Sequence, residues 1–67
     1  MENKQRICDL LVPVLKETRN LHNLESLIFN PENEIVTATF NDGYTKKADV
    51  TADSGTSMIR DIIKSIV

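Results

Sequence analysis

The residues that could carry covalent chemistry are few and lie apart in the chain. Cys8 is the only cysteine and His22 the only histidine, so thiol catalysis would need these two side chains to meet, with Asn23 to orient the imidazole. Cys8 borders the apolar stripe of the first predicted helix, a position typical of a small buried hydrophobic residue. We therefore expect no catalytic residue and interpret the chain as a non-enzymatic protein.

A metal site is not predicted either. Such a site needs several ligands at short spacing, and the chain has neither a His-x3-His nor a Cys-x2-Cys pattern. The single cysteine also excludes an internal disulfide, which is typical of a reduced, intracellular protein. Glu32 and Glu34 lie in or beside a predicted turn, where we interpret them as solvated charges and not as an acid–base pair. We expect no metal and no cofactor.

The best candidate for binding a small ligand is the run Ser54-Gly55-Thr56-Ser57. It opens the last predicted helix, whose first N–H groups and positive dipole end favour an anion. Gly55 would let an anion approach the backbone and the hydroxyl groups add donors, so a phosphate or a nucleotide could bind there. A plain helix cap by Asp53 or Ser54 explains the same residues, and the Asp53 carboxylate would repel an anion. Capping is the favoured interpretation and phosphate binding the alternative.

Length and composition restrict the class of protein. The 67 residues, 40% hydrophobic and 27% charged, predict one globular domain over residues 1–67. The apolar runs are too short for a membrane helix or a secretory signal, so we expect a cytoplasmic protein. The net charge of −2, with Lys46-Lys47 as the only adjacent basic pair, disfavours nucleic acid as a partner. A domain this small has a marginal core, which favours self-association.

Two amphipathic helices are predicted at the ends of the chain. The first covers residues 3–20, where Pro13 lies opposite the apolar stripe, so the helix is expected to bend and not to break. Its stripe consists of Ile7, Leu10, Leu11, Val14, Leu15 and Thr18. The last runs from about Ser54 to the C-terminus. Its stripe consists of Met58, Ile59, Ile62, Ile63, Ile66 and Val67.

Three strands are predicted between the helices. They lie over residues 24–29, 34–40 and 44–50. The run Asn41-Asp42-Gly43 marks the second hairpin, which we interpret as a three-residue loop with Gly43 in a left-handed bulge. This register pairs Phe40 with Tyr44 and directs both rings beneath the helices, because it separates apolar from charged side chains better than a two-residue loop.

The first hairpin leads to the predicted contact surface. A turn over residues 30–33 is expected to pair Phe29 with Glu34 and to bring Ile28 opposite Ile35. Both isoleucines then lie on the sheet face that no helix covers, within a row of threonines. The predicted partner-binding residues are Ile28, Ile35, Thr37 and Thr39.

The order of elements predicts an α+β domain. In this α-β-β-β-α arrangement, a three-stranded antiparallel meander is covered on one face by both helices. The order resembles that of the double-stranded-RNA-binding domain, in topology only. That resemblance implies a polar loop after the first strand and a basic start to the last helix. Here the loop carries Glu32 and no basic residue precedes Arg60 in the last helix, so RNA binding is not expected.

A second resemblance spans most of the chain. It is carried by the runs Thr18-Arg19-Asn20-Leu21, Phe40-Asn41-Asp42-Gly43-Tyr44-Thr45-Lys46-Lys47, Asp53-Ser54-Gly55-Thr56 and Met58-Ile59-Arg60-Asp61-Ile62. In these runs the chain resembles small uncharacterised proteins of Gram-positive bacteria and their prophages or mobile elements. The resemblance implies a short accessory protein that acts by binding a host factor, a defence protein or a small nucleotide, and it assigns no residue a role.

These observations favour a small binding protein, a homodimer or a partner of another protein, that uses the open sheet face around Ile28 and Ile35. Phosphate or nucleotide binding at residues 54–57 is the alternative. An enzyme built on Cys8 and His22 is the third and least favoured hypothesis. The sequence leaves open whether self-association uses the sheet face or a sheet edge.

Overall fold

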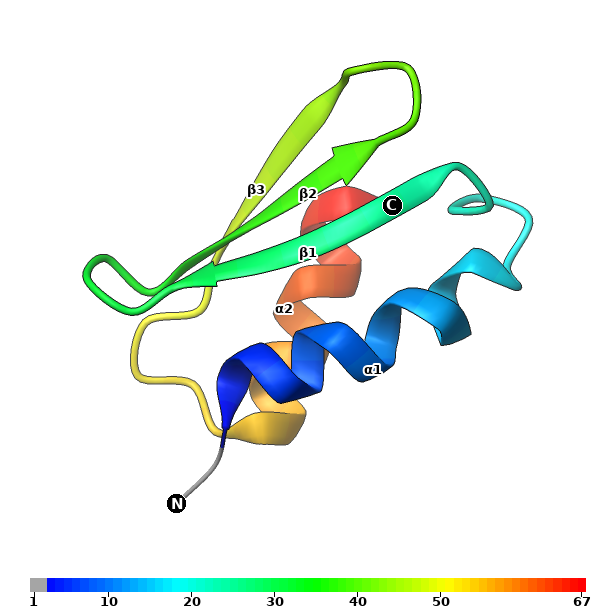
Figure 1. Ribbon diagram of the computed structural model, residues 1–67. Coiled ribbons are helices and arrows are strands. Elements are labelled where there is room, and N and C mark those ends of the chain that lie inside the picture. The colour runs from blue at the N-terminus through cyan, green and yellow to red at the C-terminus, as the bar shows by residue number, and fades with distance from the viewer. Residues whose placement is uncertain (1–2) are drawn as a thin grey trace.

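The computed structural model describes residues 3–67, which form a helix, three strands and a second helix (Figure 1). The helices are α1 (Lys4–Lys16) and α2 (Gly55–Ile66), and the strands are β1 (Leu24–Asn30), β2 (Ile35–Phe40) and β3 (Thr45–Asp49). The strands form one antiparallel sheet in the order β1-β2-β3, with both helices on the same side of it. α1 packs against β1, and α2 packs against β3. The predicted α+β fold is confirmed.

A single hydrophobic core fills the space between the sheet and the helices. Alternate residues of the strands point into it, and each helix adds one face. Its buried members are Cys8, Leu15, Leu21, Leu24, Leu27, Val36, Ala38, Phe40, Ala48, Val50, Met58, Ile62 and Ile66. No polar or charged residue is buried within the described part of the chain. The core therefore lies on one side of the sheet and leaves the other sheet face uncovered.

The face of α1 that meets the sheet differs from the predicted stripe. Cys8 and Leu15 are buried, whereas Leu10 and Val14, predicted to face the core, are 57% and 62% exposed. Apolar residues occupy so much of this helix that two neighbouring stripes were possible. A polar contact from Gln5 to the sheet selects between them.

Gln5 joins α1 to the main chain of β1. Its Nε2 donates a hydrogen bond to the Leu27 carbonyl oxygen at 3.1 Å, and its Oε1 accepts one from the Phe29 N–H at 2.8 Å. The amide side chain thus pairs with β1 much as a neighbouring strand would. This pairing fixes the rotation of α1 and closes the outer edge of β1.

α1 is shorter than predicted at its C-terminal end. It ends at Lys16, not at residue 20. The Thr18 hydroxyl and N–H both donate to the Leu15 carbonyl oxygen, at 2.6 and 3.0 Å, and so end the helix early. Pro13 is exposed, and the helix continues through it unbroken as predicted.

The second hairpin has the predicted register. Val36 lies opposite Ala48, and the Phe40 N–H donates to the Tyr44 carbonyl oxygen at 2.9 Å across a loop in which Gly43 has φ 91°. Phe40 is buried as predicted, but the prediction that Tyr44 lies beneath the helices is wrong, because its side chain is 68% exposed. Figure 1 shows the reason: the end of this hairpin reaches past α2.

The predicted register of the first hairpin is wrong by two residues. Asn30 pairs with Ile35, and Phe29 pairs with Val36 in place of Glu34. The turn therefore covers residues 31–34, with Glu34 in the left-handed region at φ 54° and the Asn30 amide accepting a main-chain N–H inside the turn. Because side chains alternate with a period of two, this shift leaves every side chain on its predicted face.

α2 begins where the sequence predicts. Ser54 is the N-cap residue, but its side chain forms no capping hydrogen bond. The buried residues of α2 are Gly55, Met58, Ile62 and Ile66. Ile63 and Val67, also predicted for the stripe, lie at its border and are 36% and 62% exposed. No helix in residues 3–67 is long and apolar enough to cross a membrane.

Candidate functional site

The four predicted partner-binding residues lie together on the uncovered side of the sheet, called the open face below. Ile28 of β1 is directly across from Thr37 of β2, and Ile35 and Thr39 flank Thr37 along the same strand. Ile28 is 54% exposed, and the other three are half-buried between strands. By strand register, the open face carries Ser26, Ile28, Ile35, Thr37, Thr39, Thr45, Lys47 and Asp49.

The predicted pairing of the two isoleucines is wrong. Because the first hairpin is shifted, Ile28 faces Thr37, while Ile35 lies between Asn30 and Asp49. The two isoleucines are diagonal neighbours on one surface, where side chains of this length remain within reach of each other. The open face thus keeps its apolar centre, bordered by hydroxyl groups.

Charges lie only at one border of the open face. Lys47 and Asp49 project from β3, and Asp49 is held by Thr51, whose N–H and Oγ1 donate to Asp49 Oδ1 at 2.9 and 2.6 Å. These hydrogen bonds lower the pKa of Asp49, so its carboxylate is ionised at neutral pH. An apolar centre with a polar rim is the usual anatomy of a protein-binding surface.

The four residues of the alternative ligand site lie together at the start of α2, as predicted. Ser54 and Thr56 are exposed, Ser57 is half-buried, and Gly55 is buried. Ser54 Oγ lies 3.4 Å from Ser57 Oγ, so these two hydroxyl groups bond to each other. α2 has 12 residues, enough for a helix dipole at this end.

Acidic groups beside this segment work against an anion. The pKa of Asp53 is raised, first by hydrogen bonding with Asp61, then by burial and by the negative charge of Asp61. Two carboxyl groups hydrogen-bond to each other only when one of them holds a proton. Asp53 Oδ2 is buried and has no hydrogen-bond partner among the described residues. A phosphate at Ser54 would meet this negative charge.

Cys8 and His22 do not form a catalytic pair. Cys8 is fully buried, and burial followed by the charge of Asp9 raises the pKa of its thiol to about 11. His22 is exposed, with Nδ1 3.0 Å from the Arg19 carbonyl oxygen. A neutral, enclosed thiol is not a nucleophile. Residues 3–67 also contain no cluster of His, Cys, Asp and Glu that could hold a metal ion.

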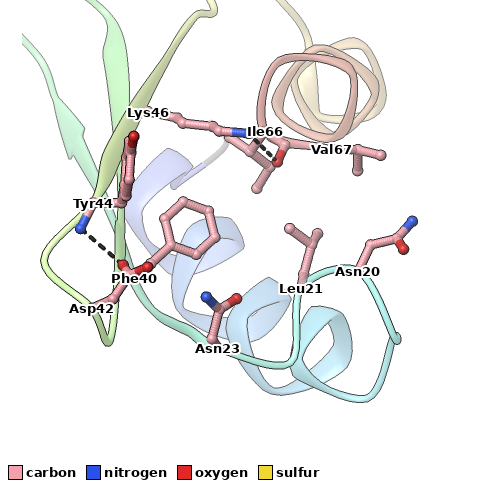
Figure 2. A pocket seen from close by; sticks show the side chains of 9 residues that line it. All are labelled: Asn20, Leu21, Asn23, Phe40, Asp42, Tyr44, Lys46, Ile66 and Val67. Carbon is pink, nitrogen blue, oxygen red and sulfur yellow. Dashed lines mark hydrogen bonds between the residues drawn. The ribbon is translucent and has the colours of Figure 1, made fainter.

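A pocket that the sequence did not predict lies at one end of the two layers. It is an open hollow with a volume of about 440 Å³, bordered by the loop after α1, the β2–β3 hairpin and the C-terminal end of α2 (Figure 2). Its lining residues are Asn20, Leu21, Asn23, Phe40, Asp42, Tyr44, Lys46, Ile66 and Val67. Lys46 Nζ donates to the Ile66 carbonyl oxygen at 3.4 Å. No sequence signal marks the pocket, because its walls come from three distant segments.

The structure defines a class: a small two-layer α+β protein of α-β-β-β-α order with an open sheet face. Comparison of the chain with protein-family models, curated proteins and solved structures found no match.

Proposed function

We propose that this chain is a non-enzymatic binding protein that contacts another protein molecule, a second copy or a different partner, through the open face. One observation carries the proposal: Ile28 is 54% exposed on a sheet face that neither helix covers. The half-buried Ile35, Thr37 and Thr39 extend this surface along β2. A partner that covers them would remove apolar area from water.

The energy available at this surface is modest. Full burial of an isoleucine is worth about 1.5–3 kcal/mol, so covering the exposed half of Ile28 contributes roughly 1 kcal/mol. The threonine methyl groups add smaller amounts. Such a surface suits a partner that also uses the charged border at Lys47 and Asp49 for orientation.

Charge and resemblance agree with a protein partner. The net charge of −2 offers no basic stripe for a nucleic acid. The resemblance of residues 18–21, 40–47, 53–56 and 58–62 to small proteins of Gram-positive bacteria and their prophages or mobile elements fits a cytoplasmic accessory protein that acts by binding.

A pair of matched variants tests the proposal. Ile28→Lys changes the open face, whereas Val14→Lys changes an apolar residue of similar exposure on α1, 62% against 54% for Ile28. Tagged wild type and both variants are used for quantitative affinity capture from the source cells and for sedimentation at rising concentration. We expect Ile28→Lys to lose a captured protein, or self-association, that Val14→Lys retains. Equal capture and equal sedimentation by all three proteins would refute the role of the open face.

The phosphate alternative has one structural observation in its favour. Ser54 forms no side-chain capping bond, and its hydroxyl group lies 3.4 Å from that of Ser57, so two hydroxyl groups are held together at the start of α2. The Asp53–Asp61 pair opposes it. Titration with phosphate and mononucleotides, followed by the Gly55 and Thr56 amide NMR signals, distinguishes phosphate binding from protein binding. If neither signal shifts at millimolar ligand, the phosphate alternative is refuted.

A further inference from the structure

The two edges of the sheet differ. At the β1 edge, the Gln5 amide occupies the Leu27 carbonyl oxygen and the Phe29 N–H, and α1 packs against the strand. At the β3 edge, the strand has no proline and no bulge, and its register with β2 is regular. Natural sheets protect an edge with such features and also with charged side chains. β3 carries the charged residues Lys46, Lys47 and Asp49, so its edge is left available to a strand whose own charges are complementary.

The main-chain groups that face outward from β3 follow from its pairing with β2. The Phe40 N–H donates to the Tyr44 carbonyl oxygen, and the Val50 N–H donates to the Glu34 carbonyl oxygen. In an antiparallel pair, hydrogen-bonded and non-bonded positions alternate, so Lys46 and Ala48 also bond to β2. The N–H and carbonyl groups directed away from the sheet are therefore those of Thr45, Lys47 and Asp49.

We propose that a second copy of the chain pairs with this edge, β3 against β3 and antiparallel, in the register that places Lys47 of each copy opposite Asp49 of the other. The two sheets then form one continuous sheet, with both open faces on one side and both helical layers on the other. Self-association by the edge engages Lys47 and Asp49, the charged border of the open face, and leaves its apolar centre around Ile28 and Ile35 available to a different partner.

Charge selects this register from the neighbouring ones. In a symmetric antiparallel dimer, one residue near the middle of β3 lies opposite the same residue of the second copy. That central residue can be Lys46, Lys47 or Ala48. Centring on Lys47 sets two lysines opposite each other, and centring on Lys46 sets Thr45 opposite Lys47. Only the pairing centred on Ala48 sets unlike charges opposite each other. It does so twice per dimer, with Lys47 of each copy opposite Asp49 of the other. Directly opposed unlike charges stabilise an antiparallel pair, and like charges destabilise it.

The two charged side chains are available for this pairing. Lys47 is exposed and forms no ion pair within residues 3–67. Asp49 is exposed, and its Oδ1 is held in place by Thr51. Ala48, at the centre of the proposed dimer, has a small side chain that points into the core. The edge is thus complementary to itself.

Charge reversal provides the test, read as the dimer dissociation constant from analytical ultracentrifugation. We expect Lys47→Glu and Asp49→Lys each to raise that constant about tenfold or more, because unlike pairs become like pairs at both positions. An equimolar mixture of the two variants restores both unlike pairs, so it is expected to form a heterodimer of near wild-type affinity. The double variant Lys47→Glu/Asp49→Lys is expected to dimerise like the wild type.

Asp49→Lys removes the carboxylate that accepts hydrogen bonds from Thr51. If the Asp49→Lys variant does not fold, Asp49→Asn takes its place in the mixing experiment. Mixed with Lys47→Glu, it restores one Lys47–Asp49 pair and should recover part of the affinity. In the wild type, the Lys47 and Asp49 amides should exchange hydrogen more slowly as protein concentration rises.

The proposal is overturned if the wild type is monomeric at millimolar concentration, if the mixture does not associate, or if the two amides exchange at a rate independent of concentration. Its failure is distinct from failure of the open-face proposal. A dimer formed through the β3 edge should keep its dissociation constant in Ile28→Lys, because that change leaves the edge intact. Association through the open face, with a second copy or with another protein, should be lost in the same variant.

Discussion

Replacing Gln5 by Leu is expected to destabilise the protein and to open the β1 edge. The substitution keeps similar side-chain volume but removes both hydrogen bonds to β1, to the Leu27 carbonyl oxygen at 3.1 Å and from the Phe29 N–H at 2.8 Å. Leucine offers neither donor nor acceptor, so both partly buried main-chain groups lose their partner.

The expected magnitude follows from the number of bonds lost. A hydrogen bond contributes about 0.5–1.5 kcal/mol net, so losing two costs roughly 1–3 kcal/mol. Domains have about 0.05–0.15 kcal/mol of stability per residue, or about 3–10 kcal/mol for 67 residues. The loss is therefore a large fraction of the total. With a urea m-value of about 1 kcal/mol per M for so small a domain, the midpoint should fall by about 1–3 M.

Urea unfolding followed by circular dichroism measures this loss, and NMR hydrogen exchange of the Phe29 amide locates it. Asp9→Ala is the matched control, because it removes only the exposed bond from Gln5 Nε2 to Asp9 Oδ1 and should change stability by less than about 0.5 kcal/mol. An unchanged midpoint and unchanged exchange of Phe29 in Gln5→Leu would show that Gln5 does not close this edge. The β1 edge would then be as available for pairing as the β3 edge.

Three further predictions test other parts of the structure. Cys8 should react with a thiol reagent about a hundredfold more slowly in the native protein than in urea, since burial raises its pKa from 9.0 to about 11; equal rates would contradict its burial. Asp61→Asn should stabilise the protein at neutral pH. Because folding raises the pKa of Asp53, the protonated Asp53 favours folding below its unfolded pKa, and this contribution is lost as the pH rises through its folded pKa. In urea titrations, Asp61→Asn should therefore be more stable than the wild type at neutral pH and lose that advantage in acid. An advantage that does not change with pH would argue against the Asp53–Asp61 pair. Gly43→Ala should cost about 1–2 kcal/mol through strain alone, because φ is 91° and no atom lies within 4 Å of the added methyl group; an unchanged midpoint would refute the bulge.

The strands and their faces could be predicted because local signals determine them. The alternation of residues 34–40 and 44–50 and the glycine at position 43 specify the second hairpin and its register. The first hairpin lacks a glycine, and its left-handed position falls on Glu34, a residue that rarely adopts that conformation. Its register was therefore misplaced, although by an even number of residues, so Ile28 still reaches the open face.

The errors in the helical layer come from long-range contacts. The rotation of α1 depends on Gln5 meeting β1, a contact between residues more than 20 positions apart. The periodicity of Leu10 and Val14 carries no information about that contact and therefore predicts that both face the core. The exposure of Tyr44 depends on where α2 ends relative to the hairpin, and the pocket beside it depends on three separate segments.

The most direct test of the open face is site-specific photo-crosslinking in the source cells. A photoreactive amino acid is placed at Thr37, on the open face, or at Val14, on the exposed side of α1. The account predicts a protein adduct from position 37 that is absent from position 14 and is lost when Ile28→Lys is added. The same adducts from both positions, or an adduct from position 37 that persists with Ile28→Lys, would contradict it.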